Sequence, residues 1–185
     1  IRLQENGKVP QDNPFLKNRK GRAEIFSYGH RNPQGMALHP KTGKIWVHEH
    51  GPQGGDEINI LKAGANYGWP KTTFGEQYGG GKIGIGPKSP GIEEPLLHWT
   101  PSIAPSGMDF YQGDIFPNWN GDLLVGSLKF RMLVRIDLEE SLVQGQEVVF
   151  QDRIGRVRDV RVSPEGKVYL LNDEYRGGIF RLDPL

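Results

Sequence analysis

The chain has 185 residues, a formal net charge of +1 and no cysteine. This length suits one domain or two small ones, and the balanced charge offers no polybasic surface to a nucleic acid. Without cysteine, disulfides and thiolate chemistry are excluded in this chain, and no apolar run reaches the roughly 18 residues of a membrane-spanning helix. The chain opens inside what reads as a strand and a turn, so we expect further sequence to precede it.

Glycine and proline mark turns along the whole chain. They number 26 and 14, and short apolar runs lie between them. These runs predict strands at 23–29, 44–50, 56–61, 94–100, 107–111, 121–128, 132–139, 147–152, 157–164, 167–173 and 178–185. The best helical period, at 138–147, is short and interrupted by Gly145. Many short strands between turns predict an all-β sandwich, barrel or propeller.

A repeated unit favours the propeller. Residues 35–51 resemble residues 158–174, and residues 107–128 have the same strand–turn–strand pattern with a longer turn. A further strand follows each hairpin, as in propeller blades. At roughly 40–50 residues per blade the chain would hold about four blades, and a two-sheet β-sandwich is the alternative. Long loops, above all 62–95, would then crown one face and carry function.

Donor side chains recur beside the predicted strands. Arg31 and Asn32 stand together in a turn, and Lys129 follows a strand. Arg156 and Arg158 lie two residues apart, so they share one side of a strand, and paired guanidinium groups suit a carboxylate or a phosphate. If the strand ends meet at one propeller face, these side chains converge on a pocket for a polyanionic ligand. The alternative is that Arg31 and Asn32 form a solvated turn.

The segment that follows the second predicted strand offers metal ligands. His48 and His50 are spaced for a transition metal, but no third ligand stands at a recognised spacing. The turn at Gly51–Pro52 exposes main-chain carbonyls, which suit calcium, and Asp56 and Glu57 add carboxylates nearby. Asp56 is alternatively a cap at the start of the next strand.

Two tryptophans lie outside the regular strand pattern. Trp69 stands in a polar, glycine-rich stretch, and we expect it to pack between blades. Trp99 ends a strand just before Pro101, where it either packs in the same way or covers a flat ligand by stacking.

Six motifs, taken in order, resemble one family over nearly the whole chain. They read GHRNPQGMALHP, EHGPQGGDEINIL, GANYGWP, HWTPSIAPSGMDFY, GSLK and GRVRDVRVSPEGKVYLL. Together they resemble the soluble quinoprotein glucose dehydrogenases, and more closely the aldose sugar dehydrogenase branch, the glucose/sorbosone dehydrogenase group. The resemblance implies a six-bladed propeller that binds pyrroloquinoline quinone (PQQ) and calcium. It also implies oxidation of aldoses at the anomeric carbon to lactones, an external electron acceptor, a monomer or homodimer, and a periplasmic or secreted location.

The resemblance also implies roles for the donor residues. Arg31 and Asn32 would meet the quinone oxygens and stabilise the charge that develops as hydride arrives, which makes them the catalytic pair. Lys129, Arg156 and Arg158 would hold the cofactor carboxylates. By the same resemblance, Trp99 would lie against the plane of the cofactor or the substrate.

The same resemblance implies two calcium sites. Gly51 and Pro52 would offer main-chain carbonyls to a calcium ion that polarises the quinone. Glu57 and Tyr67 match a second, structural site.

The family's general base, a histidine, lies upstream of the GHRNPQG motif, and His30 within that motif is not its counterpart. We therefore expect residues 1–185 to form a partial propeller whose upstream blades are absent from this chain. The main alternative is a non-catalytic propeller that binds a protein or a glycan. A calcium-stabilised lactonase-type propeller ranks last, because only Asn172 and Asp173 are obvious inward ligands.

Overall fold

The protein is built almost entirely of short antiparallel strands. The computed structural model describes residues 1–17 and 20–184, and within them no α-helix occurs, so none is available to span a membrane. Within the described residues, a 3-10 turn, η1, covers Pro117–Trp119. The strands are β1 (Pro33–Leu38), β2 (Ile45–Glu49), β3 (Asp56–Ile60), β4 (Leu97–Trp99), β5 (Pro105–Phe110), β6 (Leu123–Ser127), β7 (Met132–Glu139), β8 (Leu142–Gln151), β9 (Val157–Val162), β10 (Val168–Asn172) and β11 (Ile179–Leu182).

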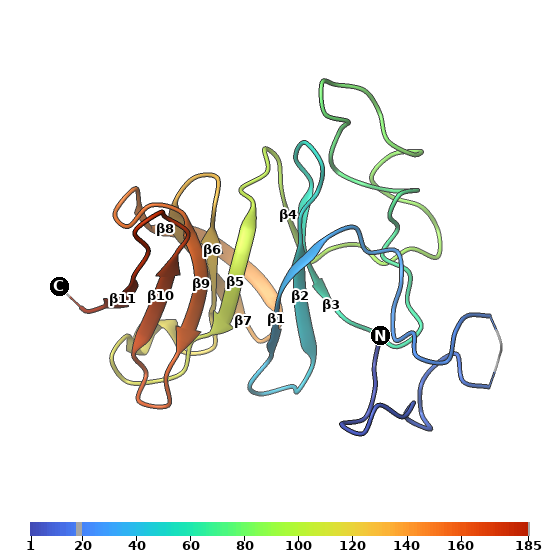
Figure 1. Ribbon diagram of the computed structural model, residues 1–185, viewed down its shortest axis with the longest axis horizontal. Helices are drawn as coiled ribbons and strands as arrows, with labels where there is room; N and C mark the ends of the chain where they lie inside the picture. Colours follow the sequence, from blue (N-terminus) through green and yellow to red (C-terminus); the bar gives the residue numbers. More distant parts are fainter. Residues whose placement is uncertain (18–19, 185) are drawn as a thin grey trace.

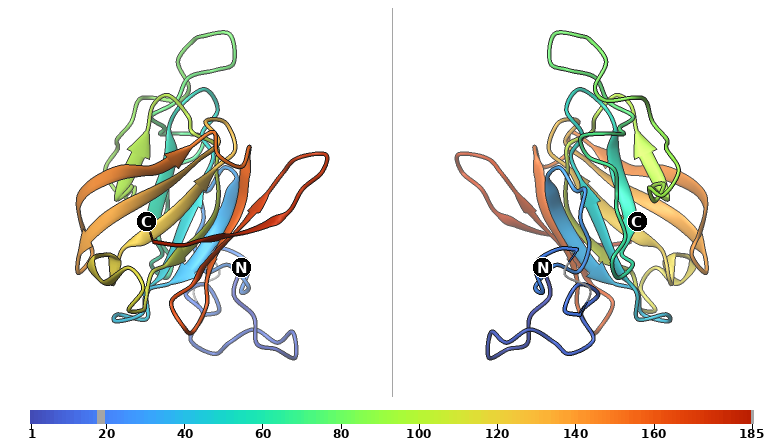
Figure 2. Two further views of the ribbon diagram at one scale, coloured as in Figure 1. Left: turned by 90° about the vertical axis from the view of Figure 1, so that its left-hand side faces the viewer. Right: turned by 90° about the vertical axis from the view of Figure 1, so that its right-hand side faces the viewer.

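The strands form three sheets in chain order. Their strand orders are β1-β2-β3-β4, β5-β6-β7-β8 and β9-β10-β11, and every neighbouring pair is antiparallel. The first strands of the sheets lie side by side, since β1 contacts β5 and β5 contacts β9 (Figure 1). In the views of Figure 2 the β9–β11 sheet reaches away from the other two. This is the blade arrangement of a propeller, and it confirms the all-β prediction.

The chain length allows about four blades, and the structure shows three sheets because two long segments contribute no strand. These are the described part of residues 1–32 and residues 61–96. The run at 23–29, predicted as a strand, makes a single bridge from Tyr28 to Asn66. Gly29, which follows Tyr28, has φ +77, and a Cβ there would overlap the Asn66 side chain. The backbone therefore turns against the loop instead of pairing with a strand.

The helical period at 138–147 is a β-hairpin. Strand β7 ends at Glu139 and β8 begins at Leu142, so that Glu139 pairs with Leu142 and Leu138 with Val143. Glu140, in the connecting turn, has φ +58, which an α-helix does not allow. Cross-strand pairing with β7 thus overrides a weak local helical preference.

Two apolar clusters hold the sheets together. Between the first and second sheets the cluster includes Trp46, Ile58, Met108, Leu123 and Ile136, all fully buried. A second cluster joins the second and third sheets and includes Tyr111, Leu124, Leu133, Val157 and Val160. Each such side chain contributes about 1.5–3 kcal/mol by leaving water, so the inter-sheet contacts hold the arc together.

Candidate functional site

The direction of the strands places the predicted site residues at one end of the molecule. In each sheet the first strand begins, and the second strand ends, at the end that we name the site end. The pairs that mark it are Pro33 with Glu49, Pro105 with Ser127, and Val157 with Asn172. The opposite end, the far end, carries the turns at 39–44, 111–122 and 163–167. The site end lies uppermost in Figure 1.

Arg31 lies directly before β1 and is fixed to the turn that follows β2. Its guanidinium group donates to the carbonyl oxygens of His50 at 3.1 Å and of Gly51 at 3.0 Å. Its other face lies over the ring of Trp69, 5.2 Å from the ring centroid. The structure therefore brings the predicted anion donor and the predicted calcium turn into direct contact. Because a carbonyl oxygen has two lone pairs, Gly51 retains acceptor capacity for a cation.

Asn32 is the exposed neighbour of Arg31. Its side-chain oxygen accepts a hydrogen bond from the Gln34 amide at 3.0 Å, and its main-chain carbonyl accepts one from the His50 amide. Asn32 is therefore held beside Arg31 at the site end, although it borders none of the described cavities.

The Gly51–Pro52 turn borders a cavity of about 560 Å³. The turn is buried, and a Cβ on Gly51 would overlap the Gly54 carbonyl oxygen. The long loop between β3 and β4 reaches the site end and contributes Phe74, Glu76 and Tyr78 to the cavity. The remaining lining residues are His50, Gln53, Gly54, Thr100, Pro101, Ser102, Ala104 and Lys129. This volume lies in the range of small-molecule and cofactor sites.

Lys129 supplies a cation to this cavity. The residue is exposed, and its ammonium group lies 5.2 Å from the centroid of the Phe130 ring. Across residues 1–17 and 20–184, no ion pair involves its side chain. An uncompensated ammonium group at a cavity rim attracts an anionic ligand.

Arg156 and Arg158 also stand at the site end, but the structure separates their surroundings. The Arg156 guanidinium group forms an ion pair with Asp173 at 3.0 Å. Arg158 is exposed and borders a different hollow, of about 440 Å³, along the first strands of the three sheets. The prediction that all four cations line one cavity is therefore not met within these 185 residues. Arg31 borders the small hollow beside Glu49 and Glu57, Lys129 borders the cavity of about 560 Å³, and Arg158 borders the hollow along the first strands.

The two tryptophans exchange the places expected for them. Trp99 is only 7% exposed, belongs to the core between the first two sheets, and donates its Nε1–H to Gln146 at 2.9 Å. Its ring therefore packs inside the protein and does not line the cavity predicted to hold a flat ligand. Trp69, expected to pack between blades, instead lies beneath Arg31 at the site.

Glu57 and Tyr67 border one small polar hollow, together with Glu49. Burial, followed by the charges of Glu49 and Asp56, raises the pKa of Glu57 to about 7. Asn59 donates to Glu57 at 3.2 Å and to Glu49 at 3.3 Å, while its own buried side-chain oxygen has no partner among the described residues. Such oxygen donors fit a hard cation such as calcium.

The contribution of Tyr67 to that hollow is limited to its backbone and ring. Its hydroxyl group donates to the Ile60 carbonyl at 2.7 Å and accepts from the Lys62 amide at 2.9 Å. Its ring stacks on His30 at 4.6 Å. A cation in this hollow would therefore meet the main-chain carbonyl of Tyr67 and not its phenol oxygen. In the described part of the chain, no group of three or more acidic, histidine or cysteine side chains is arranged to hold a metal.

His48 and His50 do not form a zinc site. His48 is fully buried, neither ring nitrogen has a partner in the described chain, and burial lowers its pKa to about 3. His50 turns elsewhere and donates from Nε2 to the Pro105 carbonyl at 2.6 Å. The spacing of the two residues places their side chains in different environments.

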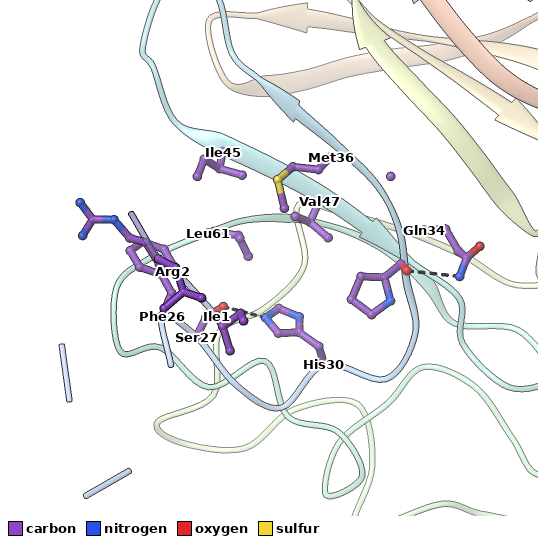
Figure 3. Close-up of a pocket in the computed structure, with 13 residues that line it drawn as sticks. Ile1, Arg2, Phe26, Ser27, His30, Gln34, Met36, Ile45, Val47 and Leu61 are labelled. Carbon is purple, nitrogen blue, oxygen red and sulfur yellow. Dashed lines mark hydrogen bonds between the residues drawn. The ribbon is translucent and has the colours of Figure 1, made fainter. Parts of the chain in front are cut away.

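An apolar hollow of about 540 Å³ lies away from the predicted donors (Figure 3). The N-terminal residue Ile1 and Phe26 face Met36, Ile45 and Val47 across it. None of the side chains predicted to bind a cofactor lines this hollow. It is therefore not the candidate site.

Sequence reasoning missed a cluster of buried polar residues on β2 and β3. Glu49 accepts from His30 at 2.9 Å, and Asn59 bridges two carboxylates. The signal was available, because Glu57 and Asn59 are two residues apart, alternate with Ile58 and Ile60, and must share a face of the strand. Polar residues at alternate positions of a buried strand indicate a polar site behind the sheet.

Three sheets arranged as blades define part of a β-propeller, with cations and a carbonyl-bearing turn gathered at one end. The chain belongs to the glucose/sorbosone dehydrogenase family, whose family model matches residues 1–181. This finding confirms the resemblance seen in the sequence motifs.

Individual relatives agree with the family assignment. The chain is 45% identical to the aldose sugar dehydrogenase YliI of Escherichia coli strain K12, over 186 residues that make up 100% of this chain and 50% of that protein. A crystal structure of a glucose dehydrogenase matches with a TM-score of 0.97 and 46% identity, covering 100% of this chain and 54% of that one. The PQQ-bound aldose sugar dehydrogenase of Streptomyces coelicolor matches with a TM-score of 0.75 and 26% identity, covering 99% and 51%. The chain thus spans about half the length of these relatives.

Proposed function

We propose that these residues form the cofactor-binding half of an oxidoreductase that oxidises aldose sugars at the anomeric carbon to lactones, with PQQ and calcium. The observation that carries the proposal is the contact between Arg31 and the Gly51 carbonyl, beside a cavity that Lys129 also lines. The PQQ-bound relative supports the choice of cofactor. An external electron acceptor completes the reaction.

The donor set suits a flat cofactor with several carboxylates. Lys129 and Arg158 present cations without an ion-pair partner among the described residues, and each stands at the site end. Arg31 and Asn32 supply donors close to the Gly51–Pro52 turn. PQQ, when bound, would supply a quinone carbon as the acceptor of a hydride from the sugar. Fixed donors such as Arg31 stabilise negative charge at the moment it develops, because they need not reorient.

Calcium would be held by oxygen atoms at two places. Gly51 and Pro52, whose main-chain carbonyls would be the ligands, line the larger cavity, and the Gly51 oxygen is held by a hydrogen bond from Arg31. Glu57 and Tyr67 border the smaller polar hollow, where the Glu57 carboxylate and the Tyr67 main-chain carbonyl would be the ligands. Both sets consist of the hard oxygen ligands that calcium prefers.

None of the five histidines of this chain is placed as the base that takes the sugar hydroxyl proton. His30 is bonded to Ser27 and Glu49, and His50 to the Pro105 carbonyl. The other three are His39, bonded at the far end to the Glu140 carbonyl, His48, which is fully buried, and His98, which stacks on Phe74. The proposal therefore places the base outside residues 1–185.

The test uses the complete protein, freed of metal and cofactor. Adding PQQ and calcium together should produce glucose-dependent reduction of a dye acceptor, with a lactone as the product. Either addition alone should give little activity. A complete protein that binds no PQQ in the presence of calcium would contradict the proposal and favour a propeller that binds a protein or glycan.

A further inference from the structure

Asp56, the first residue of β3, is a buried carboxylate with donors on every side. It is 0% exposed. Its Oδ1 accepts the Gly51 amide at 2.9 Å and the Ser102 hydroxyl at 2.9 Å. Its Oδ2 accepts the same hydroxyl at 2.7 Å and the amides of Ile103 and Ala104 at 2.8 and 2.9 Å. Both oxygens are thus occupied by N–H and O–H groups, so Asp56 is not available as a ligand of calcium.

The donors come from two loops that border the same cavity. Gly51 belongs to the turn after β2, whereas residues 102–104 connect the first sheet to the second. Gly51, Ser102 and Ala104 all line the cavity of about 560 Å³. The carboxylate therefore joins two separate stretches of the cavity wall from behind.

Further hydrogen bonds link the 102–104 loop to the backbone of Lys129. The Ile103 carbonyl accepts the Ser127 hydroxyl at 2.6 Å and the Lys129 amide at 3.2 Å. The adjacent Ala104 carbonyl accepts the Leu128 amide at 3.0 Å. Ala104 has φ +52, a conformation that a residue with a Cβ adopts only when its surroundings impose it. The hydrogen bonds on both sides of residues 102–104 supply that constraint.

We propose that Asp56 is a positioning residue that sets the spacing between the Gly51 carbonyl and the Lys129 side chain. The inference rests on the proposed function, in which these two groups hold calcium and the anionic cofactor. Without the carboxylate, the turn after β2 and the 102–104 loop lose their shared partner. The cation-binding and anion-binding walls then move independently, and the cavity no longer presents both groups at a fixed distance.

The decisive variant is Asp56→Asn. It keeps the size of the side chain but puts an NH₂ group where one oxygen accepts N–H or O–H donors, so one of the two loops loses its partner. The second variant, Ser102→Ala, removes a single donor and leaves the carboxylate in place. It should shift every readout in the same direction by a smaller amount, and it serves if Asp56→Asn folds poorly.

Asp122→Asn is the matched control. Asp122 is also buried, 3% exposed, and accepts bonds from the Arg135 guanidinium group at 2.9 Å and the Leu138 amide at 3.0 Å. It precedes β6 and therefore lies at the far end. Replacing either carboxylate should lower thermal stability. Only the replacement of a positioning carboxylate should also change cofactor affinity.

The experiment combines two measurements on the complete protein. PQQ is titrated at fixed calcium, and amide hydrogen exchange is followed in the cofactor-free state. For Asp56→Asn we expect the Kd for PQQ to rise about tenfold or more, with turnover recovering at saturating PQQ and the KM for the sugar unchanged. Exchange should accelerate together at 51–54, 102–104 and 128–130. For Asp122→Asn we expect neither effect.

The two hypotheses fail in different ways. If the wild-type protein binds PQQ and both Asp56→Asn and Ser102→Ala bind it equally tightly, the positioning role is overturned while the proposed function stands. If the wild-type protein binds no PQQ, the proposed function is overturned. Hydrogen exchange then decides whether Asp56 couples the loops, because faster exchange in one loop alone, or in neither, rules out the coupling.

Discussion

Glu57 and Asn59, two residues apart on β3, face each other behind the sheet, where the Asn59 amide donates to the Glu57 carboxylate at 3.2 Å. The same amide reaches Glu49 at 3.3 Å. One neutral amide thus serves two buried acidic groups. This arrangement leaves a negative charge that is incompletely compensated, and it makes stability at this position dependent on pH and on cations.

The first prediction concerns that pH dependence. The pKa of Glu57 is raised from 4.5 to about 7. Between pH 4.5 and about 7, the folded protein therefore retains a proton that the unfolded chain has released. In calcium-free protein, Glu57 therefore lowers the free energy of unfolding as the pH rises through the window. In Glu57→Gln, this decrease in the free energy of unfolding, on the order of 2 kcal/mol, should be absent. Urea unfolding at about pH 5 and about pH 8 measures it, and an unchanged pH dependence in the variant would contradict the assignment.

The second prediction has the opposite sign. Burial lowers the pKa of His48 from 6.5 to about 3, so the unfolded chain binds a proton that the folded protein excludes. The stability associated with neutral His48 is present above pH 6.5 and is lost as the pH falls toward 3. In His48→Met, the free energy of unfolding should fall less steeply as the pH is lowered, and the pH dependence that comes from Glu57 should be unchanged. Unfolding midpoints measured across the acid range test it, and an acid limb that is as steep in the variant shows that other groups govern it.

The third prediction separates binding from stability at Lys129. The side chain is exposed and unpaired in the described structure, so Lys129→Met should change the free energy of unfolding by less than about 0.5 kcal/mol. PQQ affinity should fall about tenfold or more. Lys41→Met, an exposed lysine at the far end, is the control and should change neither quantity. Equal PQQ affinity in the two variants would remove Lys129 from the site.

The fourth prediction concerns Arg31. Its guanidinium group bonds two carbonyl oxygens at once and covers Trp69, which a lysine ammonium group cannot reproduce. Arg31→Lys should therefore lower stability by about 1–2 kcal/mol and reduce turnover by more than the loss of PQQ binding explains. Arg2→Lys, at an exposed ion pair with Asp12, is the matched control. Wild-type turnover in Arg31→Lys argues against a catalytic role.

The fifth prediction concerns the backbone of the calcium turn. Gly51→Ala would drive a Cβ into the Gly54 carbonyl oxygen, whereas Gly145→Ala would meet nothing within 4 Å. We expect Gly51→Ala to abolish calcium binding and to cost about 3 kcal/mol or more of stability. Gly145→Ala should behave like the wild type. Isothermal titration with calcium and thermal unfolding distinguish the two outcomes, and normal calcium binding by Gly51→Ala would place the ion elsewhere.

The sequence predicted those features that depend on neighbouring residues. Period-two patterns and turn residues located most strands, and the repeated hairpin identified the propeller. The strand predicted at 23–29 and the short helical period at 138–147 differ from the structure for a common reason. At both places tertiary pairing decides the backbone conformation: the 65–68 loop in the first and β7 in the second.

The kinds of residue at the candidate site were predictable from the sequence, but the contacts between them were not. The cations and the carbonyl turn were found from residue type and spacing, and the structure places them at one end. By contrast, the partners of Asp56 at positions 102–104 lie 46 to 48 residues away along the chain. The contact of Trp99 with Gln146 spans 47 residues. Such contacts depend on how sheets pack together, and local spacing carries no information about them.

The common direction of the first strands has a practical consequence for site-specific attachment. Since the candidate site occupies one end of the sheets, the turn at 39–44 is a point for attachment that leaves the opposite surface facing solution. Lys41 in that turn is exposed, and this chain contains no cysteine. A Lys41→Cys replacement thus gives these residues one thiol at the end opposite the candidate site, to which a surface or a probe can be attached. The cavity of about 560 Å³ would then face away from the attached side.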